Sequence, residues 1–319
     1  MDEKILLEAN HLKKYFKAGK KNLHAVDDVS FRIGRGRTLG VVGESGCGKT
    51  TLGRLLLRMI PATDGRIIYD GADITDDSHG QLREVRKKMQ MIFQDPYGAL
   101  DPRLPVRHLI GEPFKNYKIC KNRNEYNERV AHLMNTVGLD ERYADSYSHE
   151  LDGGRRQRIG IGRALALDPE FIVCDEPVSA LDVSIQAQVL NLLMDLQDEK
   201  GLTYIFITHD LSVVKHISHE IMVMYLGQCV EYTNTKELFG NPCHPYTKGL
   251  LDAVPVPSMT AKQLSTEVMR GELSSPLEPP PGCRFAARCP QATDKCKGED
   301  IPLAEVAPGH WTACTLFAQ

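Results

Sequence analysis

One stretch of the sequence has the residue types and spacing of a phosphate-binding loop. From residue 43 to residue 50 it reads glycine, four residues, glycine, lysine and threonine. Glycines let the backbone curl so that successive N–H groups point into one concavity, and a following helix adds positive potential there. Lys49 can reach the β- and γ-phosphates, and Thr50 can bind Mg²⁺. We therefore predict an ATP site formed by Gly43, Glu44, Ser45, Gly46, Cys47, Gly48, Lys49, Thr50 and Thr51.

Two adjacent carboxylates supply the second half of this chemistry. Asp175 and Glu176 directly follow the apolar residues 171–174. A carboxylate at the end of a buried strand can hold Mg²⁺, and its neighbour can orient or deprotonate an attacking water. We assign Asp175 to the metal and Glu176 to the base. An exposed acidic turn is the alternative, and the four apolar residues before the pair disfavour it.

The elements that must position these groups alternate between strands and helices. Residues 39–42 form a predicted strand that ends at the loop, and a helical pattern follows until Pro61. Further strands are expected at residues 171–174, 202–207, 221–224 and 226–231, with a helix from Asp182 to Gly201. This rhythm predicts an α/β fold with a largely parallel sheet. Between about residues 95 and 168 it lapses, and we expect an inserted helical subdomain there.

Composition limits the remaining possibilities. The 319 residues suggest two domains, and a run of prolines after Asn241 places the boundary near residue 240, giving domains 1–240 and 241–319. Because those prolines preclude a regular helix throughout, we expect the second region to be largely extended. No stretch approaches the roughly 18 apolar residues that span a bilayer, so we expect a cytoplasmic protein. A net charge of -3 disfavours a dedicated nucleic-acid binder.

With these motifs together, the sequence resembles the nucleotide-binding subunits of ABC transporters over about residues 5–240. The resemblance rests on Gln94 after an apolar strand, the pair Gly153 and Gly154, residues 179–182 and His209. It implies that Gln94 senses Mg²⁺ and the γ-phosphate, that His209 polarises the γ-phosphate, and that Asp182 belongs to the D-loop. Phe16 is then the first candidate to stack on adenine and Tyr15 the second, whereas a core role is the alternative for Phe16.

Within that family the chain is most similar to the F-type ATPase of dipeptide and oligopeptide importers. Residues 93–97, 176–183, 241–242 and 244–247 are typical of it. This resemblance implies a heterodimer with a second ABC ATPase, two transmembrane permease subunits and an extracytoplasmic peptide-binding protein, at the cytoplasmic face of the membrane. Nickel importers share much of the pattern, and a DNA-repair ABC ATPase is a more distant alternative.

Four cysteines gather in the last part of the chain, in the spacing C-x5-C-x6-C-x17-C: Cys283, Cys289, Cys296 and Cys314. Four thiolates suit a tetrahedral Zn²⁺ or a [4Fe–4S] cluster, because both take four sulfur ligands. Similar tails of peptide-importer ATPases hold a [4Fe–4S] cluster, and the resemblance favours it over zinc. Free thiols without a metal are the third possibility. A bound metal would also stabilise a tail with little core of its own.

The family signature departs from its usual form. The family reads Leu-Ser-Gly-Gly-Gln, whereas residues 151–155 here contain Asp152 and Arg155 beside Gly153 and Gly154. In this family each ATP lies between one chain's phosphate loop and the other chain's signature, so Asp152 would face the γ-phosphate. We expect this repulsion to be offset only in part by Arg155. Gly162, inside the following helix, further indicates a relaxed signature helix.

Overall fold

The computed structural model describes residues 4–253 and 275–317, and their contacts divide the chain into two units. The first unit combines Met1–Asp76 with Phe206–Gln319, and the second is Asp77–Ile205. The described residues beyond the expected boundary near residue 240 therefore belong to the same unit as the phosphate loop. The division into domains 1–240 and 241–319 stays a prediction.

An antiparallel sheet opens the first unit, with strand order β2-β1-β4-β5. Its strands are β1 (Ile5–Ala18), β2 (Lys21–Gly34), β4 (Asp64–Tyr69) and β5 (Ala72–Asp73). In β2 the buried residues Val29, Phe31 and Ile33 alternate with exposed polar ones. This period of two places one face of the strand on the core and the other in solvent.

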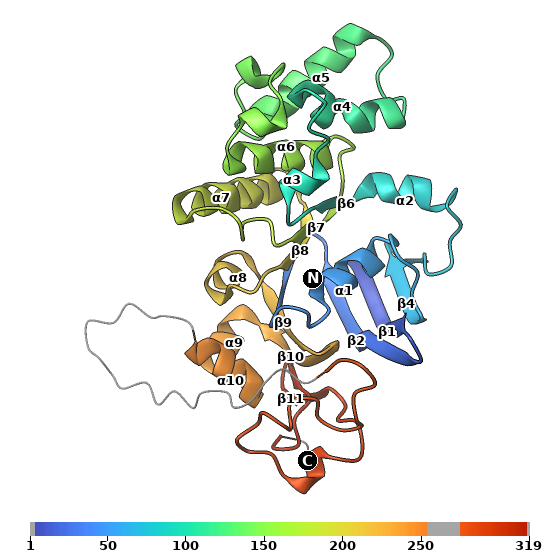
Figure 1. Ribbon diagram of the computed structural model, residues 1–319, viewed down its shortest axis with the longest axis vertical. Coiled ribbons are helices and arrows are strands. Elements are labelled where there is room, and N and C mark those ends of the chain that lie inside the picture. The colour runs from blue at the N-terminus through green and yellow to red at the C-terminus, as the bar shows by residue number, and fades with distance from the viewer. Residues whose placement is uncertain (1–3, 254–274, 318–319) are drawn as a thin grey trace, which may run out of the picture. The chain divides into compact units, whose positions relative to one another are not determined.

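A second set of strands in the first unit leads to the phosphate loop (Figure 1), in the order β11-β12-β10-β9-β3. Strand β3 (Thr38–Val42) runs parallel to β9 (Glu220–Tyr225), and β10 (Gln228–Asn234), β12 (His310–Thr312) and β11 (Ala304–Ala307) follow in antiparallel pairs. The helices of this unit are α1 (Lys49–Leu56), α8 (Leu211–Ile217), α9 (Thr235–Gly240) and α10 (Pro245–Asp252). Strand β3 is buried along its whole length, as its apolar sequence predicts.

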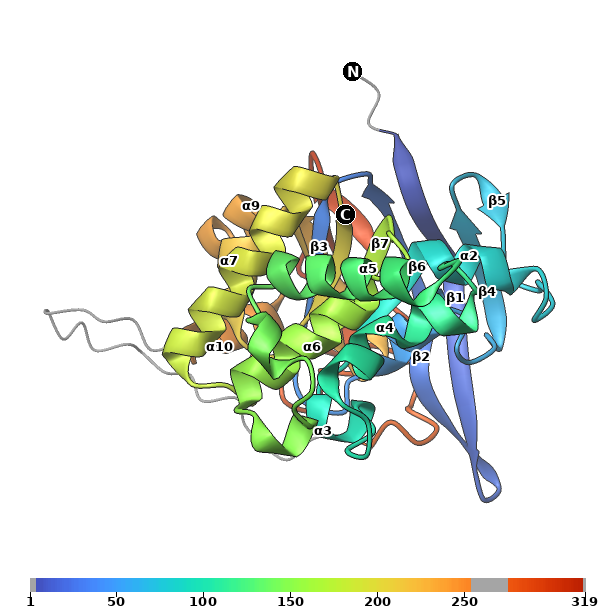
Figure 2. The ribbon, with the colours of Figure 1, turned by 90° about the horizontal axis from the view of Figure 1, so that it is seen from above.

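The second unit contains the parallel strands β6 (Met89–Ile92) and β7 (Phe171–Asp175). Its helices are α2 (Leu82–Lys88), α3 (Pro96–Ala99), α4 (Val106–Asn116), α5 (Arg123–Thr136), α6 (Gly153–Leu165) and α7 (Val183–Lys200). Figure 2 shows α4, α5 and α6 gathered together, in the stretch that the sequence predicts to be helical. Strand β8 (Thr203–Ile207) crosses the division between the units.

Two expected elements have different bounds. The helix after the phosphate loop ends at Leu56, well before Pro61, because Arg58 takes a positive φ of 52°. The expected strand at residues 226–231 begins only at Gln228, because Leu226 and Gly227 form a turn with φ values of 43° and 87°.

The proline-rich region is extended only in part. Pro245 begins α10, where the first helical position tolerates a residue without an N–H group. Pro255 and Pro257, which were also expected to be in an extended segment, lie outside the residues that the structure describes. Phe285 packs among buried residues of the same unit, with ring centroids 5.3 Å from those of Tyr225 and Tyr246. This part of the tail therefore packs into the core of the first unit.

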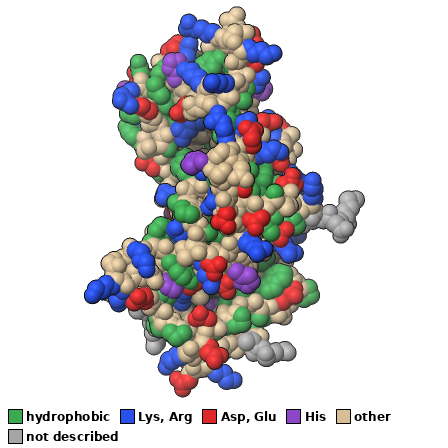
Figure 3. All heavy atoms as spheres, turned by 90° about the vertical axis from the view of Figure 1, so that its right-hand side faces the viewer, with side chains coloured by type: hydrophobic (Ala, Val, Ile, Leu, Met, Phe, Trp, Pro, Cys, Tyr) green, Lys and Arg blue, Asp and Glu red, His purple; other side chains and the backbone are tan. Residues whose placement is uncertain are grey.

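The distribution of charged side chains and the polarity of the described helices agree with the composition of the sequence. Figure 3 shows basic and acidic side chains interspersed over one face of the molecule. Among the residues described, none of the helices combines the length and apolar character needed to cross a bilayer.

Candidate functional site

The phosphate loop joins the end of β3 to the start of α1. Gly43, Gly46 and Gly48 take positive φ values of 150°, 80° and 106°, which let the backbone curl. A Cβ at Gly43 would lie 2.2 Å from the carbonyl oxygen of Met224. One at Gly48 would lie 2.0 Å from the carbonyl oxygen of Ala25. Both positions therefore require glycine.

Lys49 is the first residue of α1 and is held across the loop. Its side chain donates from Nζ to the carbonyl oxygens of Gly43, at 2.7 Å, and Glu44, at 3.0 Å. The residue is 5% exposed, so the ammonium group lies inside the concavity that the sequence predicts. The first N–H groups of α1 lack partners within the helix and add positive potential at the same place.

The expected base and the expected sensor glutamine meet in the second unit. Strands β6 and β7 are parallel and pair Ile92 with Cys174, so both strands end at the same edge of the sheet. Gln94 Nε2 donates to Glu176 Oε2 at 2.9 Å. Asp175 ends β7 and is 3% exposed, and Glu176 follows with a positive φ of 45°. A non-glycine residue in this left-handed region is strained, a feature that clusters at functional sites.

Other predicted site residues lie at the starts of helices. Thr50 and Thr51 lie in the first turn of α1, in the first unit, whereas Gln94 and Asp175, the other expected Mg²⁺ ligands, lie in the second. His209 is exposed in the first unit, just after β8. Asp182 caps α7, and a hydrogen bond from the hydroxyl of Ser184 lowers the pKa of Asp182.

The signature segment turns Asp152 into a helix cap. Asp152 Oδ1 accepts a hydrogen bond from the backbone N–H of Arg155 at 2.8 Å, and the Arg155 guanidinium pairs with the other carboxylate oxygen. Serine and aspartate are both good N-caps, so aspartate in place of the family's serine leaves a capping residue at this position. A Cβ at Gly154 would lie 2.6 Å from Ile185 Cγ2, so the helix start packs closely on α7.

Comparisons with known proteins agree with this geometry. The family model described as ABC transporter matches residues 26–179, and the model for the C-terminal region of oligopeptide and dipeptide transporters matches residues 230–296. The chain is 50% identical to the oligopeptide transport ATP-binding protein AppF of Bacillus subtilis, with 99% of each chain covered. The chain belongs to the oligopeptide and dipeptide group of ABC transporter ATPases.

Other relatives and solved structures extend the likeness. The oligopeptide transport ATP-binding protein OppF of Haemophilus influenzae is 46% identical, with 98% of this chain and 97% of the relative covered. The solved ATP-binding cassette MJ0796, a post-hydrolysis dimer with ADP and phosphate, is 27% identical with a TM-score of 0.67. The match covers 72% of this chain and 99% of the MJ0796 chain. As a member of this family, the chain is an enzyme that hydrolyses ATP.

The two aromatic candidates for adenine differ in their surroundings. Phe16 is 38% exposed, and Lys14 Nζ lies 5.1 Å from its ring centroid. Tyr15 stacks on His24 with centroids 4.0 Å apart, and its hydroxyl donates to Asp27. Burial, and next the hydrogen bond to Asp27, raise the pKa of Tyr15. The exposed ring of Phe16 is consistent with Phe16 being preferred over Tyr15 for stacking on adenine, and this assignment stays a prediction.

Asp27 also anchors the C-terminal region of the ATPase. Arg284 pairs with its carboxylate and donates to the carbonyl oxygen of Leu226, and the guanidinium is almost fully buried. Burial is the largest influence on Asp27 and acts to raise its pKa. Hydrogen bonds from Tyr15, His24 and Arg284 together outweigh burial and lower the pKa.

The four tail cysteines line one small pocket together with His244. His244 Nδ1 accepts a hydrogen bond from the backbone N–H of Tyr246 at 3.1 Å, so the proton of the neutral ring lies on Nε2. Burial lowers the pKa of His244 to about 4. Among the described residues Nε2 is buried without a hydrogen-bond partner. A buried N–H group of this kind is costly unless an acceptor meets it.

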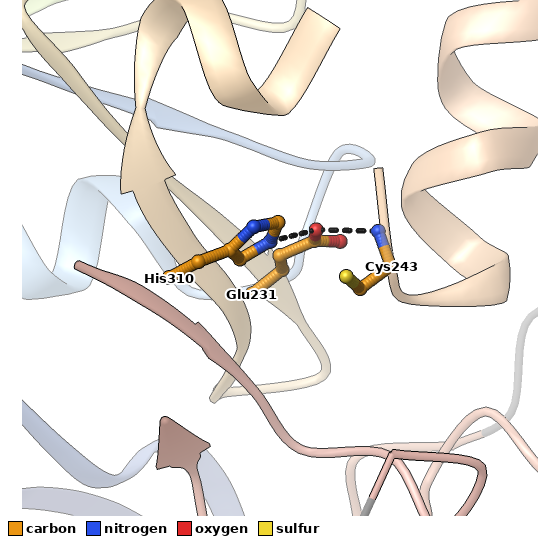
Figure 4. Close-up of side chains that lie close together, drawn as sticks. All are labelled: Glu231, Cys243 and His310. Carbon is orange, nitrogen blue, oxygen red and sulfur yellow. Dashed lines mark hydrogen bonds and ion pairs between the residues drawn. The ribbon is translucent and has the colours of Figure 1, made fainter. Parts of the chain in front are cut away.

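A separate cluster fixes the last strands (Figure 4). Ligand atoms of Glu231, Cys243 and His310 lie within 4.8 Å of one another. Glu231 accepts hydrogen bonds from His310 Nε2 at 2.7 Å and from the backbone N–H groups of Cys243 and His244 at 2.7 and 2.9 Å. Because three donors occupy this buried carboxylate, the cluster acts as an anchor that joins β10, the start of α10 and β12.

Sequence reasoning missed Arg284 and Arg288, the two arginines that tie the tail of the ATPase to the rest of the first unit. Arg284 and Arg288 are buried, although arginine is rarely so without a partner. The only hint in the sequence was that each of these arginines stands next to a tail cysteine, Arg284 after Cys283 and Arg288 before Cys289. The carboxylates that pair with them, Asp27 and Glu44, lie more than 240 positions away and have no local pattern.

Proposed function

We propose that this ATPase is the motor subunit of an importer for dipeptides or oligopeptides, and that Glu176 is its catalytic base. The hydrogen bond between Gln94 and Glu176 carries the catalytic part, because it orients the carboxylate at the strand end where such a base is required. The substrate class rests on the relatives, among them the oligopeptide transport proteins AppF and OppF.

Hydrolysis needs a base, an orienting group and charge stabilisation. Glu176 accepts a proton from the water that attacks the γ-phosphorus, while the bond from that phosphorus to the β–γ bridging oxygen breaks and ADP leaves. Gln94 holds the carboxylate and contacts the same water. Lys49, the loop N–H groups and His209 stabilise the charge that develops on the phosphate oxygens.

The donor set fits Mg²⁺. Thr50, Gln94 and Asp175 offer a hydroxyl, an amide and a carboxylate oxygen, which are the hard ligands that this ion takes, directly or through water. When bound, the ion neutralises charge on the β- and γ-phosphates.

We propose that the four tail cysteines hold a [4Fe–4S] cluster rather than a single zinc ion. Zinc with bonds of about 2.3 Å would bring its four sulfurs within roughly 4 Å of one another. In the described part of the chain, no three of these sulfurs come within 4.8 Å of one another. The partnerless Nε2–H of His244 suits a sulfur acceptor in the same pocket. The free volume there is about 10 Å³, so the cysteine loops would move apart around a [4Fe–4S] cluster.

Anaerobic purification tests the metal. A cluster predicts a brown protein with about four iron atoms per chain. Cys289→Ser should remove the colour, whereas Cys120→Ser, which changes a cysteine of α5's flanking loop, should keep it. A colourless anaerobic protein with stoichiometric zinc would support the alternative metal.

In the assembly that we propose, this subunit pairs with a second ABC ATPase beneath two permease subunits, at the cytoplasmic face of the membrane. An extracytoplasmic binding protein delivers the peptide. The presence of both halves of an ATP site in this chain, the loop at Lys49 and the signature at Asp152, supports a head-to-tail pair.

Reconstitution with the permease and binding proteins tests the whole proposal. Labelled dipeptides and pentapeptides should enter vesicles only with ATP, and Lys49→Ala should lose both MgATP binding and uptake. Uptake of Ni²⁺ without uptake of either peptide would instead identify a nickel importer.

A further inference from the structure

Contacts from the C-terminal region reach the phosphate loop at Glu44. Both nitrogens at the end of the Arg288 side chain donate to the Glu44 carboxylate, Nη1 to Oε2 at 2.8 Å and Nη2 to Oε1 at 2.9 Å. The side chains are 8% and 22% exposed.

A second contact holds the backbone of the same residue. The backbone N–H of Glu44 donates to the hydroxyl oxygen of Tyr246 at 2.9 Å, and Tyr246 is fully buried in α10. The carbonyl oxygen of Glu44 accepts from Lys49 Nζ at 3.0 Å and from the backbone N–H of Cys47 at 3.2 Å. Glu44 therefore connects the C-terminal region directly to the lysine that binds phosphate.

Arg288 is itself fixed by its surroundings. Its Nη1 lies 3.4 Å from the Tyr225 hydroxyl oxygen, and the guanidinium lies 5.8 Å from the ring centroids of Tyr225 and Phe285. A two-point ion pair has a defined orientation as well as charge, unlike a lysine contact. The loop conformation around Glu44 thus depends on where the C-terminal region holds Arg288.

We propose that Arg288 is a positioning residue for the nucleotide, and that through its two-point ion pair with Glu44 the C-terminal region of the chain sets the affinity of its phosphate loop for MgATP. Without Arg288 the Glu44 carboxylate loses its countercharge beside a loop that must accept phosphates, and the loop samples other conformations. The inference concerns nucleotide binding by this chain and holds whichever substrate is transported.

Binding of the fluorescent analogue methylanthraniloyl-ATP with Mg²⁺ to the full chain tests this proposal. We expect Arg288→Gln and Glu44→Gln each to weaken binding about tenfold, and the double variant to be no weaker than either single one, because both changes remove the same pair. Arg288→Lys keeps the charge but loses the two-point geometry, and it should fall between wild type and Arg288→Gln. It also provides a measurement should Arg288→Gln fold poorly.

His310→Gln is the matched control. It loosens another buried anchor of the C-terminal region, the contact with Glu231, without touching Glu44. We expect it to lower the melting temperature while the dissociation constant stays within about twofold of wild type. Two results would overturn the proposal: equal weakening in His310→Gln and Arg288→Gln, or wild-type affinity in both Arg288 variants.

Discussion

The pair Asp152 and Arg155 gives the sharpest test of the altered signature. In the dimer that we propose, this segment completes the partner's ATP site, where a carboxylate would face the γ-phosphate. The structure pairs Asp152 with Arg155, so the two changes should have opposite effects. Arg155→Gln exposes the carboxylate and should weaken dimer closure. Adding Asp152→Ser removes the carboxylate, keeps a helix cap and should strengthen closure beyond wild type.

The magnitude follows from charge and exposure. An uncompensated carboxylate about 4 Å from a phosphate charge costs at most about 4 kcal/mol at an effective dielectric of about 20. The Asp152 and Arg155 side chains are 53% and 43% exposed, so solvent screens them. We take about a third of the limit, about 1.4 kcal/mol, which corresponds to tenfold weaker closure for Arg155→Gln.

The assay is sedimentation of the ATPase pair with ATP, with both catalytic glutamates changed to glutamine so that closed dimers accumulate. Tyr143→Phe is the control, because it keeps the aromatic ring beside the Arg155 guanidinium, and closure should stay at the wild-type level. Arg155→Gln closing as tightly as wild type would refute the electrostatic reasoning. If the Asp152→Ser, Arg155→Gln double variant closed only as tightly as wild type, Arg155 would already cancel the charge of the Asp152 carboxylate.

Three further predictions concern catalysis and stability. Glu176→Gln should bind MgATP nearly as wild type yet lose steady-state phosphate release at least a hundredfold; unchanged release would exclude Glu176 as the base. Gly162→Ala should raise the free energy of unfolding in urea by about 1 kcal/mol, since its Cβ would lie 3.6 Å from Ile110, whereas Gly154→Ala should destabilise the fold through its close contact with α7. Asp27→Asn should cost about 3 kcal/mol at pH 7 by leaving Arg284 buried and unpaired. Because the pKa of Asp27 is lowered, its stabilisation is complete above the ordinary value of 3.8 and is lost as the pH falls through the folded pKa. The difference from wild type should therefore narrow only below about pH 4, and a gap that narrows near neutral pH would contradict this assignment.

Local signals predicted the backbone features on which the proposed ATP site rests. The glycines around Lys49 need their φ values because of nearby backbone, and the apolar run before Asp175 forms the strand, so pattern and structure agree. The cap role of Asp152 was not predicted, although aspartate is a favoured residue at the start of a helix. The sequence pattern did not show which residues far apart in the chain contact one another. The burial of Phe285 against Tyr225 and Tyr246, and the attachment of Arg288, depend on packing between distant segments.

Because Glu44 and Arg288 are far apart in the sequence, they are synthesised at different times. The two residues are 244 positions apart, and synthesis at about 5–20 residues per second places roughly 10 to 50 s between them. During that interval the glycine loop and its lysine have left the ribosome, yet the guanidinium that holds Glu44 does not exist. The positioning role proposed for Arg288 therefore implies a stage of synthesis at which the loop motif is complete but binds MgATP more weakly than the full chain does.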